Sequence, residues 1–355
     1  VSCCEEKGLV FIGPTAEQIT LFGLKHQARD LAVKNNVPLS PGSDLLSSVD
    51  AAAQEAGKIG YPVMLKSTAG GGGIGMHVVQ TRQELSGAIS AAVETAQRAF
   101  ASAGVFLERW IDRPRHVEFQ ILADLHGNAM HLYERDCSVQ RRHQKLIEES
   151  PAPGYEREPM EQRAEELSSI CRRLGYNNLG TVETLFTPDG EVGFLEMNTR
   201  IQVEHGVTEE VTGVDLVAAQ ITLAAGGHLP AQAPLQGFAM EARLYAEDAQ
   251  TLFPSTGKLV VFRPPKLHGV RIETGYREGQ VVSPYYDPLL AKIIARGTTR
   301  EQAIGRLVVA LRAFTVRGVS TNAQLLQQIL QDQLFVQGQV DTGMVARILG
   351  HQNAY

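Results

Sequence analysis

A glycine-rich segment is the first candidate for chemistry. Residues 67–76 read Ser-Thr-Ala-Gly-Gly-Gly-Gly-Ile-Gly-Met and follow Lys66, which ends a predicted strand. Glycines let backbone N–H groups approach an anion closely, so such a loop can close over phosphates. It is not a Walker loop, because no Gly-Lys-Ser/Thr follows. A simple hairpin turn is the alternative, and Lys66 shifts the balance toward nucleotide binding.

An acidic hairpin is the second candidate. Two strand-like runs, 181–186 and 191–197, flank the turn Pro-Asp-Gly, so Glu183 on one arm can face Glu196 on the other. Hard oxygen ligands on paired strands suit magnesium. If residues 197–203 are extended, one polar row is formed by Glu196, Asn198, Arg200 and Gln202. The alternative is a solvated hairpin face.

A basic run and an isolated glutamate complete the set. Residues 134–145 offer donors for phosphate or a small anion through Arg135, Arg141, Arg142, His143 and Lys145. A nucleic-acid patch is disfavoured, because the run has no aromatic residue and two glutamates follow at once. Glu204 lies close to Arg200, and Arg243 lies in the predicted strand 240–245. A structural ion pair is the alternative reading of this last group.

The elements that must position these residues follow from periodicity. Helical spacing appears at 15–35, 50–58, 167–174 and 304–311, whereas 61–66, 76–80 and 104–108 are typical of short strands. The alternation at 117–122 predicts a half-buried strand. Residues 8–14 predict a short strand that ends in a turn.

Composition limits the class of protein. The chain has 355 residues, 43% of them hydrophobic, and a formal net charge of -6, which gives no electrostatic reason to expect nucleic acid or a membrane as partner. Four cysteines without a paired spacing fit a reducing, cytoplasmic setting. We see no apolar run near the roughly 20 residues that span a bilayer.

Taken together, these segments resemble the biotin carboxylase family of the ATP-grasp superfamily. The most specific blocks are 61–76, 115–118, 134–149, 194–205 and 284–288. The resemblance implies an α+β ATP-grasp fold with a mobile glycine-rich lid. It also implies four parts: 1–39, a remnant of the N-terminal region with a connecting helix; 40–110, the lid; 111–236, the ATP-grasp core; and 237–355, the biotin carboxylase C-terminal domain. The family normally has a further N-terminal domain before residue 8, which we expect to be missing here.

The resemblance implies a ligase that forms a C–N bond, using ATP, Mg²⁺ (with Mn²⁺ as an alternative) and biotin. Cofactor-binding residues would be Lys25, Lys66, Gly72, Gly73, Glu108, Arg109, Ile111, His116, Gln140 and His143. The metal ligands would be Glu183, Glu196 and Asn198. The bicarbonate pocket would be formed by Lys145, Arg200, Gln202 and Val203. In the same scheme Glu204 is the general base on bicarbonate and Arg243 stabilises the biotin enolate, so Glu204, Arg243, Lys145 and Arg200 form the catalytic set.

A narrower likeness concerns the carboxyl acceptor. Residues 22–25, 63–70 and 203–210 look more like urea carboxylases than acyl-CoA or pyruvate carboxylases, which more often have Gly-Asp-Lys and Glu-His-Pro. Implied partners are a biotin carboxyl carrier domain, a carboxyltransferase domain and bicarbonate, with a homodimer as one option. Three alternatives stay open: a carboxylase acting on an acyl-CoA or pyruvate, a fragment that binds Mg-ATP without turnover, and a ligase that makes carbamoyl phosphate.

Overall fold

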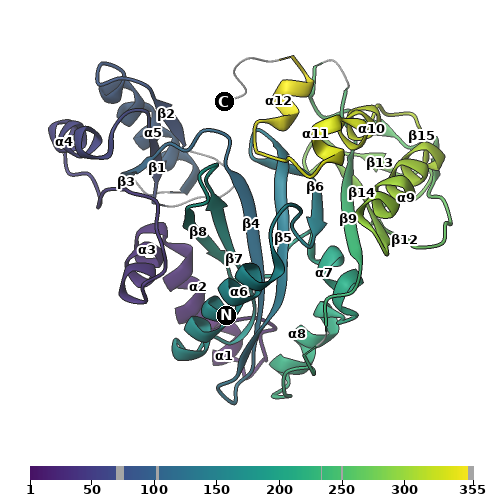
Figure 1. Cartoon of the computed structure of the whole chain (residues 1–355), viewed down its shortest axis with the longest axis horizontal. Coiled ribbons are helices and arrows are strands. Elements are labelled where there is room, and N and C mark those ends of the chain that lie inside the picture. The colour runs from purple at the N-terminus through teal and green to yellow at the C-terminus, as the bar shows by residue number, and fades with distance from the viewer. Residues whose placement is uncertain (69–75, 101–103, 233, 249–250, 351–355) are drawn as a thin grey trace.

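A computed structural model describes residues 1–68, 76–100, 104–232, 234–248 and 251–350. The lid glycines Gly72 and Gly73 lie outside these residues. Figure 1 shows a tall central sheet, with a small lobe (β1–β3, α4 and α5) on one side and the C-terminal helices on the other. In the part of the chain that the structure describes, no helix is both long and apolar enough to pass through a bilayer.

The central sheet has eight strands in the order β12-β14-β9-β6-β5-β4-β7-β8, and every neighbouring pair is antiparallel. Its strands are β4 (Arg115–Ala123), β5 (Ala129–Arg141), β6 (Gln144–Ser150), β7 (Asn178–Phe186), β8 (Val192–Asn198), β9 (Phe238–Tyr245), β12 (Val270–Glu273) and β14 (Leu289–Gly297). The predicted acidic hairpin is confirmed as β7 and β8, with Glu183 opposite Glu196.

The strand predicted for 117–122 is confirmed as part of β4, but β4 is buried on both faces, so the prediction that one face is exposed is wrong. Its apolar face packs against α6 (Arg157–Arg173), where Phe119 contacts a core that includes Met160 and Leu167. Its polar face carries Glu118 and Gln120, which are covered by a buried hydrogen-bond network instead of water. Alternation therefore identified the strand, but could not say what covers its polar side.

The small lobe is a three-stranded antiparallel sheet in the order β2-β1-β3, covered by two helices. Its elements are α4 (Val49–Ile59), β1 (Val63–Ser67), β2 (His77–Val79), α5 (Leu85–Phe100) and β3 (Val105–Arg109). Alanines at helical spacing let α4 pack closely, and Ala52 and Ala56 are fully buried against Leu65 and Leu107.

Two predictions near the N-terminus need correction. The helical pattern at 15–35 forms two helices, α2 (Ala16–Gly23) and α3 (Lys25–Lys34), because Leu24 between them is extended. The strand predicted at 8–14 is not formed, and the only helix before Ala16 is α1 (Ser2–Glu6). Among the described residues no strand pairs with this segment, and a strand needs a neighbour to satisfy its backbone groups.

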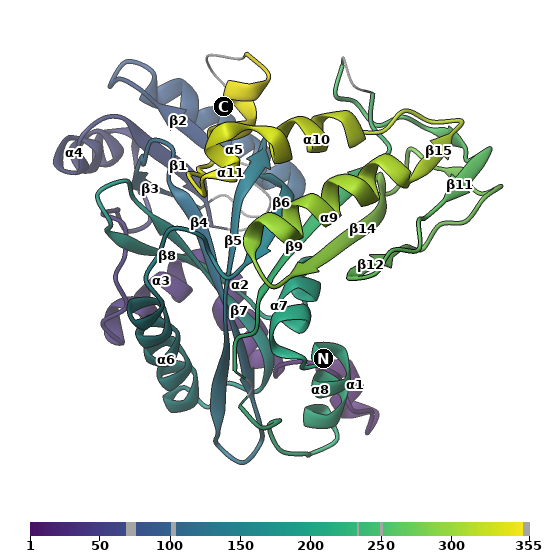
Figure 2. The same cartoon turned by 45° about the vertical axis from the view of Figure 1, so that its right-hand side comes forward.

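The C-terminal part packs helices against one face of β9 and β14. Ile293 and Ala242 meet Leu307 and Leu326 in one apolar core. The remaining elements are α7 (His205–Thr212), α8 (Leu216–Ala224), β10 (Gly257–Lys258), β11 (Val261–Arg263), β13 (Val281–Val282), α9 (Arg300–Ala313), β15 (Thr315–Arg317), α10 (Ala323–Gln331), α11 (Gln333–Val336) and α12 (Met344–Ile348). Figure 2 shows α9 running beside β14 and β9, while α7 lies lower along the sheet.

Candidate active site

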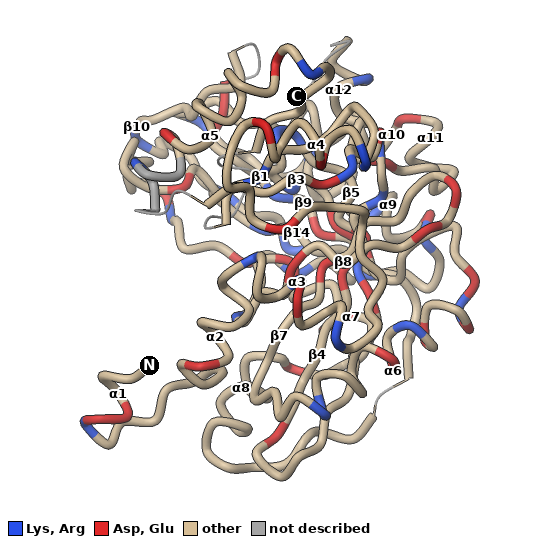
Figure 3. Tube along the Cα trace, turned by 90° about the vertical axis from the view of Figure 1, so that its left-hand side faces the viewer, with Lys and Arg blue, Asp and Glu red and all other residues tan. Residues whose placement is uncertain are grey.

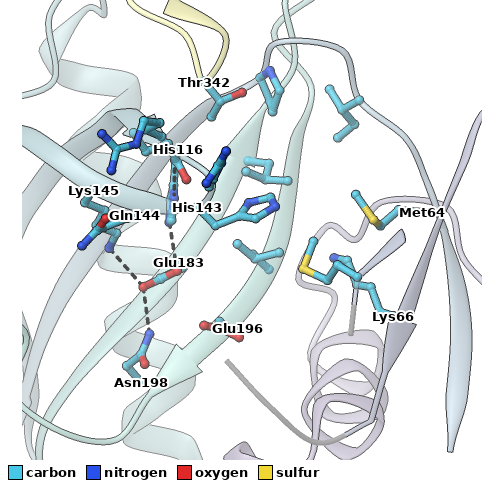
Figure 4. A pocket seen from close by; sticks show the side chains of 18 of the residues that line it. Met64, Lys66, His116, His143, Gln144, Lys145, Glu183, Glu196, Asn198 and Thr342 are labelled. Atoms are coloured by element: carbon cyan, nitrogen blue, oxygen red, sulfur yellow. Dashed lines mark hydrogen bonds and ion pairs between the residues drawn. The ribbon is translucent and has the colours of Figure 1, made fainter. Parts of the chain in front are cut away.

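A cleft of about 630 Å³ lies where the small lobe faces the central sheet. It brings together every residue for which the family resemblance implies a role and that the structure describes. Figure 4 shows several of these side chains converging on the cleft from β1, β4 and the β7–β8 hairpin. The predicted residues in its lining are Lys25, Lys66, Glu108, Arg109, Ile111, His116, Gln140, His143, Lys145, Glu183, Glu196, Asn198, Arg200, Gln202, Val203, Glu204 and Arg243.

On the small-lobe side, Glu108 is bracketed by cations. Lys66 and Arg29 both form ion pairs with its buried carboxylate, one on each oxygen. Burial raises the pKa of the Glu108 carboxyl, but Lys66 and Arg29 outweigh burial and hold that pKa below its ordinary value. An incoming anion that binds Lys66 must therefore share the ammonium group with Glu108 or displace Glu108 from it.

The acidic hairpin supplies a cluster of oxygen atoms. Oε1 of Glu183 accepts hydrogen bonds from Nδ2 of Asn198 at 2.8 Å and from Nε2 of Gln202 at 2.7 Å, while Oε2 lies 2.9 Å from Nε2 of His116. Oε2 of Glu196 lies 3.3 Å from Nζ of Lys25. Two carboxylates and an amide on paired strands are the ligand types that Mg²⁺ accepts, so the chemistry of this donor set fits that metal.

The polar row predicted over 197–203 is only partly formed. Strand β8 ends at Asn198, and the chain then turns into α7. Arg200 is exposed, and its Nη1 donates to the backbone oxygen of Ile201 at 3.2 Å. Gln202 is buried and bonds Glu183 directly. The turn therefore separates two side chains that an extended strand would place in one row.

Glu204 lies at the start of α7 between two cations. Nζ of Lys145 is 2.5 Å from its Oε1, and Nη2 of Arg243 donates to its Oε2 at 3.0 Å. Burial raises the pKa of the Glu204 carboxyl, but Lys145, Arg243 and Arg135 hold that pKa well below its ordinary value. The carboxylate is therefore ionised and fixed at both oxygens. Gly206 allows this placement, because a Cβ at that position would collide with the side chain of Ile294 on β14.

Two arginines of the predicted anion-binding run are structural. Arg135 is fully buried, and it donates to Glu118 at 2.6 Å and to Gln202 at 2.8 Å. Arg141 lines the cleft, but it makes two bonds to the carboxylate of Glu247, at 2.6 and 2.5 Å. The run also supplies Gln140, Arg142, His143 and Lys145 to the cleft, whereas Arg135 ties β5 to its neighbours.

The sequence did not predict the residues that hold the side chains and backbone of the site in place. Glu118 accepts from Nζ of Lys145 at 2.6 Å, and Glu148 accepts from Nε of Arg243 at 2.5 Å. Lys292 donates to the backbone oxygen of Val203 at 2.8 Å. Lys292 is a lone charge inside the otherwise apolar strand 289–295, and a charge there needs a partner. This pattern in the sequence is therefore a signal for a supporting residue.

Comparisons with known proteins agree over nearly the whole chain. Residues 25–232 match the family "Carbamoyl-phosphate synthase L chain, ATP binding domain", and residues 241–347 match "Biotin carboxylase C-terminal domain". Biotin carboxylase of Halalkalibacterium halodurans is 45% identical over 98% of this chain and 77% of its own length. The mitochondrial methylcrotonoyl-CoA carboxylase subunit alpha of Glycine max is 45% identical over 96% of this chain and 48% of its own length.

Solved structures give the same result. The biotin carboxylase domain dimer of Hydrogenobacter thermophilus 2-oxoglutarate carboxylase, in complex with MgADP, ADP and bicarbonate, superposes with a TM-score of 0.96 at 40% identity. The match covers 98% of this chain and 78% of that one. Rhizobium etli pyruvate carboxylase has a TM-score of 0.94 at 39% identity, over 100% of this chain and 32% of its own. With its ATP-grasp fold, this chain therefore belongs to the biotin carboxylase family.

Proposed function

We propose that this chain catalyses the carboxylation of biotin with bicarbonate, driven by ATP, and that Glu204 is its general base. The observation that carries the proposal is the position of Glu204, held by Lys145 and Arg243 at the end of a cleft that also contains Lys66 and Glu183. Residues suited to bind an anion, a base and a set of metal-type ligands thus line one cleft. That is the arrangement that phosphoryl transfer to a small anion requires.

ATP would lie between the small lobe and the hairpin. Lys66, Lys25 and His143 supply positive charge or donors for its phosphates, and His116 and Gln140 are buried residues of the same lining. The segment from Glu108 to Ile111 connects the lobe to the sheet, and the backbone N–H of Arg109 donates to Pro41 at 2.7 Å. This fixed backbone makes it a suitable wall for the adenine ring. Gly72 and Gly73 would close over the phosphates, as the sequence predicts.

Glu183, Glu196 and Asn198 would hold Mg²⁺. When bound, the metal neutralises negative charge on the ATP phosphates. In the structure Glu183 already accepts bonds from Asn198 and Gln202. Burial raises the pKa of the Glu183 carboxyl, but Lys145 and His116 hold that pKa well below its ordinary value, so the carboxylate is in the ionised form that a cation needs.

Bicarbonate would bind among Lys145, Arg200, Gln202 and the backbone of Val203, beside Glu204. Glu204 takes the proton of the bicarbonate hydroxyl, and the oxygen that loses it attacks the γ-phosphorus of ATP. The bond from that phosphorus to the ADP oxygen breaks, giving carboxyphosphate and ADP. Carboxyphosphate then yields CO₂ and phosphate, and the released phosphate takes the N–H proton of the biotin ureido ring. Arg243 stabilises the negative oxygen of the resulting enolate, whose nitrogen attacks CO₂.

The strongly lowered pKa of Glu204 has a consequence for this step. A carboxylate held by two cations is a weak base. Bicarbonate is itself an anion, so it competes with Glu204 for Lys145 and Arg243. Each contact that shifts to bicarbonate raises the pKa of Glu204 toward its ordinary value. Bicarbonate binding thus makes Glu204 a stronger base. Without bicarbonate, Glu204 stays ion-paired with Lys145 and Arg243.

The test compares Glu204→Gln with a matched control on the same helix, Glu210→Gln, whose carboxylate is partly exposed. We expect biotin-stimulated, bicarbonate-dependent ATP cleavage to fall by roughly 10² to 10⁴-fold in Glu204→Gln, the usual contribution of a general base. ADP binding should be retained, because Gln keeps the shape of the side chain. Equal cleavage rates in the wild type and Glu204→Gln would contradict the assignment of the base.

For the final acceptor we propose urea, with a carrier domain and a carboxyltransferase domain as partners. The support is the motifs Gly-Leu-Lys at 23–25 and Glu-His-Gly at 204–206. The relatives described above are named as a biotin carboxylase or as methylcrotonoyl-CoA, 2-oxoglutarate and pyruvate carboxylases, and none of them is named as a urea carboxylase. Carboxyl transfer from biotin to urea, acetyl-CoA or pyruvate by the complete enzyme would be measured side by side, and preference for either of the other two acceptors would reject the proposal.

A further inference from the structure

Three buried carboxylate oxygens behind the active site have no hydrogen-bond partner among the described residues. They are Oε2 of Glu148 and both oxygens of Glu241. Neither side chain is exposed to solvent. Buried polar atoms in proteins are nearly always bonded, and an unpaired buried carboxylate is especially unfavourable. A group of three such atoms in one place therefore needs a physical explanation.

The two glutamates lie directly opposite each other on neighbouring strands. Glu148 on β6 pairs with Glu241 on β9 in the antiparallel register, which brings Cβ atoms to within about 5.5 Å. Arg243 is two residues beyond Glu241 on the same strand, so it shares that face of the sheet. Figure 3 shows acidic and basic segments next to one another around β9 and β14. The pair thus lies immediately behind the proposed catalytic arginine.

The contacts distinguish the two carboxyl groups. Oε1 of Glu148 accepts from Nε of Arg243 at 2.5 Å, a charge-assisted bond that favours the ionised form of Glu148. The cation nearest to Glu241 is Lys292, whose Nζ is 4.0 Å from Oε2. That ammonium is already engaged by the backbone oxygen of Val203 at 2.8 Å and by Glu273 at 2.5 Å. Lys292 therefore lowers the pKa of Glu241, but by less than burial and Glu148 raise it.

We propose that Glu241 carries a proton at neutral pH and donates it in a hydrogen bond to Oε2 of Glu148. One proton would then give a partner to two of the three unbonded oxygens. Burial and the charge of Glu148 both raise the pKa of Glu241 well above its ordinary value, and burial raises the pKa of Glu148 to about 7. The charged groups acting on Glu241 come from β6, β14, β9 and the start of α7, and they are Glu148, Lys292, Arg243 and Glu204.

The protonated Glu241–Glu148 pair would hold the Arg243 side chain in position. This role for the pair rests on the proposed function. Glu148 holds Nε of the guanidinium and leaves Nη2 directed at Glu204. With Glu241 neutral, the pair places a single negative charge behind Arg243. With Glu241 ionised, two negative charges there would cancel more of the positive charge that Arg243 offers to an oxyanion. The proton on Glu241 thus keeps more of the positive charge of Arg243 available to an oxyanion.

Infrared spectroscopy tests the proton directly and needs no activity. The wild-type protein at pH 7.5 should show a protonated-carboxyl C=O band that shifts in D₂O. That band should be lost in Glu241→Gln and retained in Glu158→Gln, which removes an exposed carboxyl on α6. Absence of the band in the wild type would overturn the proposal whatever the variants do, and its survival in Glu241→Gln would assign the proton elsewhere.

Chemical unfolding at several pH values gives an independent test. Because the pKa of Glu241 is raised on folding, the stability linked to this proton is full below the unfolded pKa of about 4.3 and is lost as pH rises toward the folded pKa. Between about pH 5 and 7, the folding equilibrium constant of the wild type should fall about tenfold per pH unit relative to Glu241→Gln. Parallel curves would overturn the proposal, and Glu158→Gln should parallel the wild type.

The positioning role is tested by the pH profile of biotin-stimulated ATP cleavage. We expect the wild-type rate to fall at alkaline pH as Glu241 ionises, and this fall to be missing in Glu241→Gln. Identical profiles together with a positive infrared result would reject the positioning role and leave the proton in place. Absence of biotin-stimulated cleavage in the wild type would count against the proposed function, whereas the infrared and unfolding results would still decide on the proton.

Discussion

Two ion-pair clusters in the same cleft share one arrangement, a carboxylate between two cations. In the small lobe, Glu108 lies between Lys66 and Arg29, and at the central sheet Glu204 lies between Lys145 and Arg243. In both clusters burial raises the pKa of the carboxyl, and the flanking cations lower it further than burial raises it. Local charge alone therefore does not distinguish them.

The difference lies in what surrounds each cluster. Lys145 of the sheet cluster also contacts Glu118 and Glu183, and the whole group is tied to an eight-stranded sheet through Arg135. In the lobe cluster, Lys66 and Glu108 stand on a sheet of three strands, and Arg29 comes from α3. We infer that the lobe cluster meets its ligand through Lys66 alone, whereas the sheet cluster meets its ligands through Lys145 and Arg243 and also supplies a base, Glu204. The comparison teaches that two clusters with the same charges can differ in how many neighbours hold them.

The largest expected effect is on the sheet cluster. Lys145→Met would leave Glu118, Glu204 and Glu183 without their common cation. Removing one partner of a buried ion pair typically costs about 3–5 kcal/mol, so we expect a loss of unfolding free energy of that size, measured by urea unfolding at neutral pH. The exposed Lys258→Met serves as control. A loss of unfolding free energy below about 1 kcal/mol for Lys145→Met would contradict the view that the additional ion pairs of Lys145 stabilise the sheet cluster.

The lobe cluster should respond in ligand affinity as well as in stability, because Lys66 and Glu108 also form a buried ion pair. Lys66→Met removes a charged donor to the phosphates, and such bonds contribute about 1.5–3 kcal/mol, so MgADP should bind roughly 10- to 150-fold more weakly by calorimetry. The exposed Lys58→Met in the same lobe should bind as the wild type does. Unchanged affinity in Lys66→Met would reject the assignment of the cation as the ligand contact.

The smallest effect concerns the frame of the lobe. The hydroxyl of Ser48 accepts from the backbone N–H of Ala51 at 3.1 Å and so caps α4. Ser48→Ala should destabilise the lobe by about 1 kcal/mol, whereas Ser48→Asp, which keeps an acceptor, should not. Hydrogen exchange would report the change in α4 and leave the central sheet unaffected. Equal exchange changes in both regions would indicate that lobe and sheet unfold as one unit.

Much of the site could be predicted from the sequence. The hairpin was readable because Pro-Asp-Gly marks its turn and Glu183 and Glu196 fall at matching positions on its arms. The base and the anion-binding residues followed from a resemblance carried by continuous motifs. The predicted strand at 8–14 was wrong because a strand depends on a partner that local sequence does not reveal.

The supporting residues could not be predicted in the same way. Glu148 and Arg243 are 95 positions apart, and Glu118 and Lys145 are 27 apart, so no local pattern connects them. Arg135 lies in a basic run that predicts ligand contact, yet it is fully buried among strands. Whether a charge faces a ligand or a neighbouring strand is set by the order of strands in the sheet.

By itself the sequence determined which groups can do chemistry here, because side-chain type and strand or helix periodicity are local properties. It indicated Lys66 before the glycine loop, the paired carboxylates of the hairpin and Glu204 close to Arg200. Only the tertiary structure decided the ionisation of these groups, since the pKa of a buried carboxyl depends on charges brought close by folding. That is why Glu204 is held ionised between two cations, while Glu241, two residues from Arg243, lies beside another carboxylate.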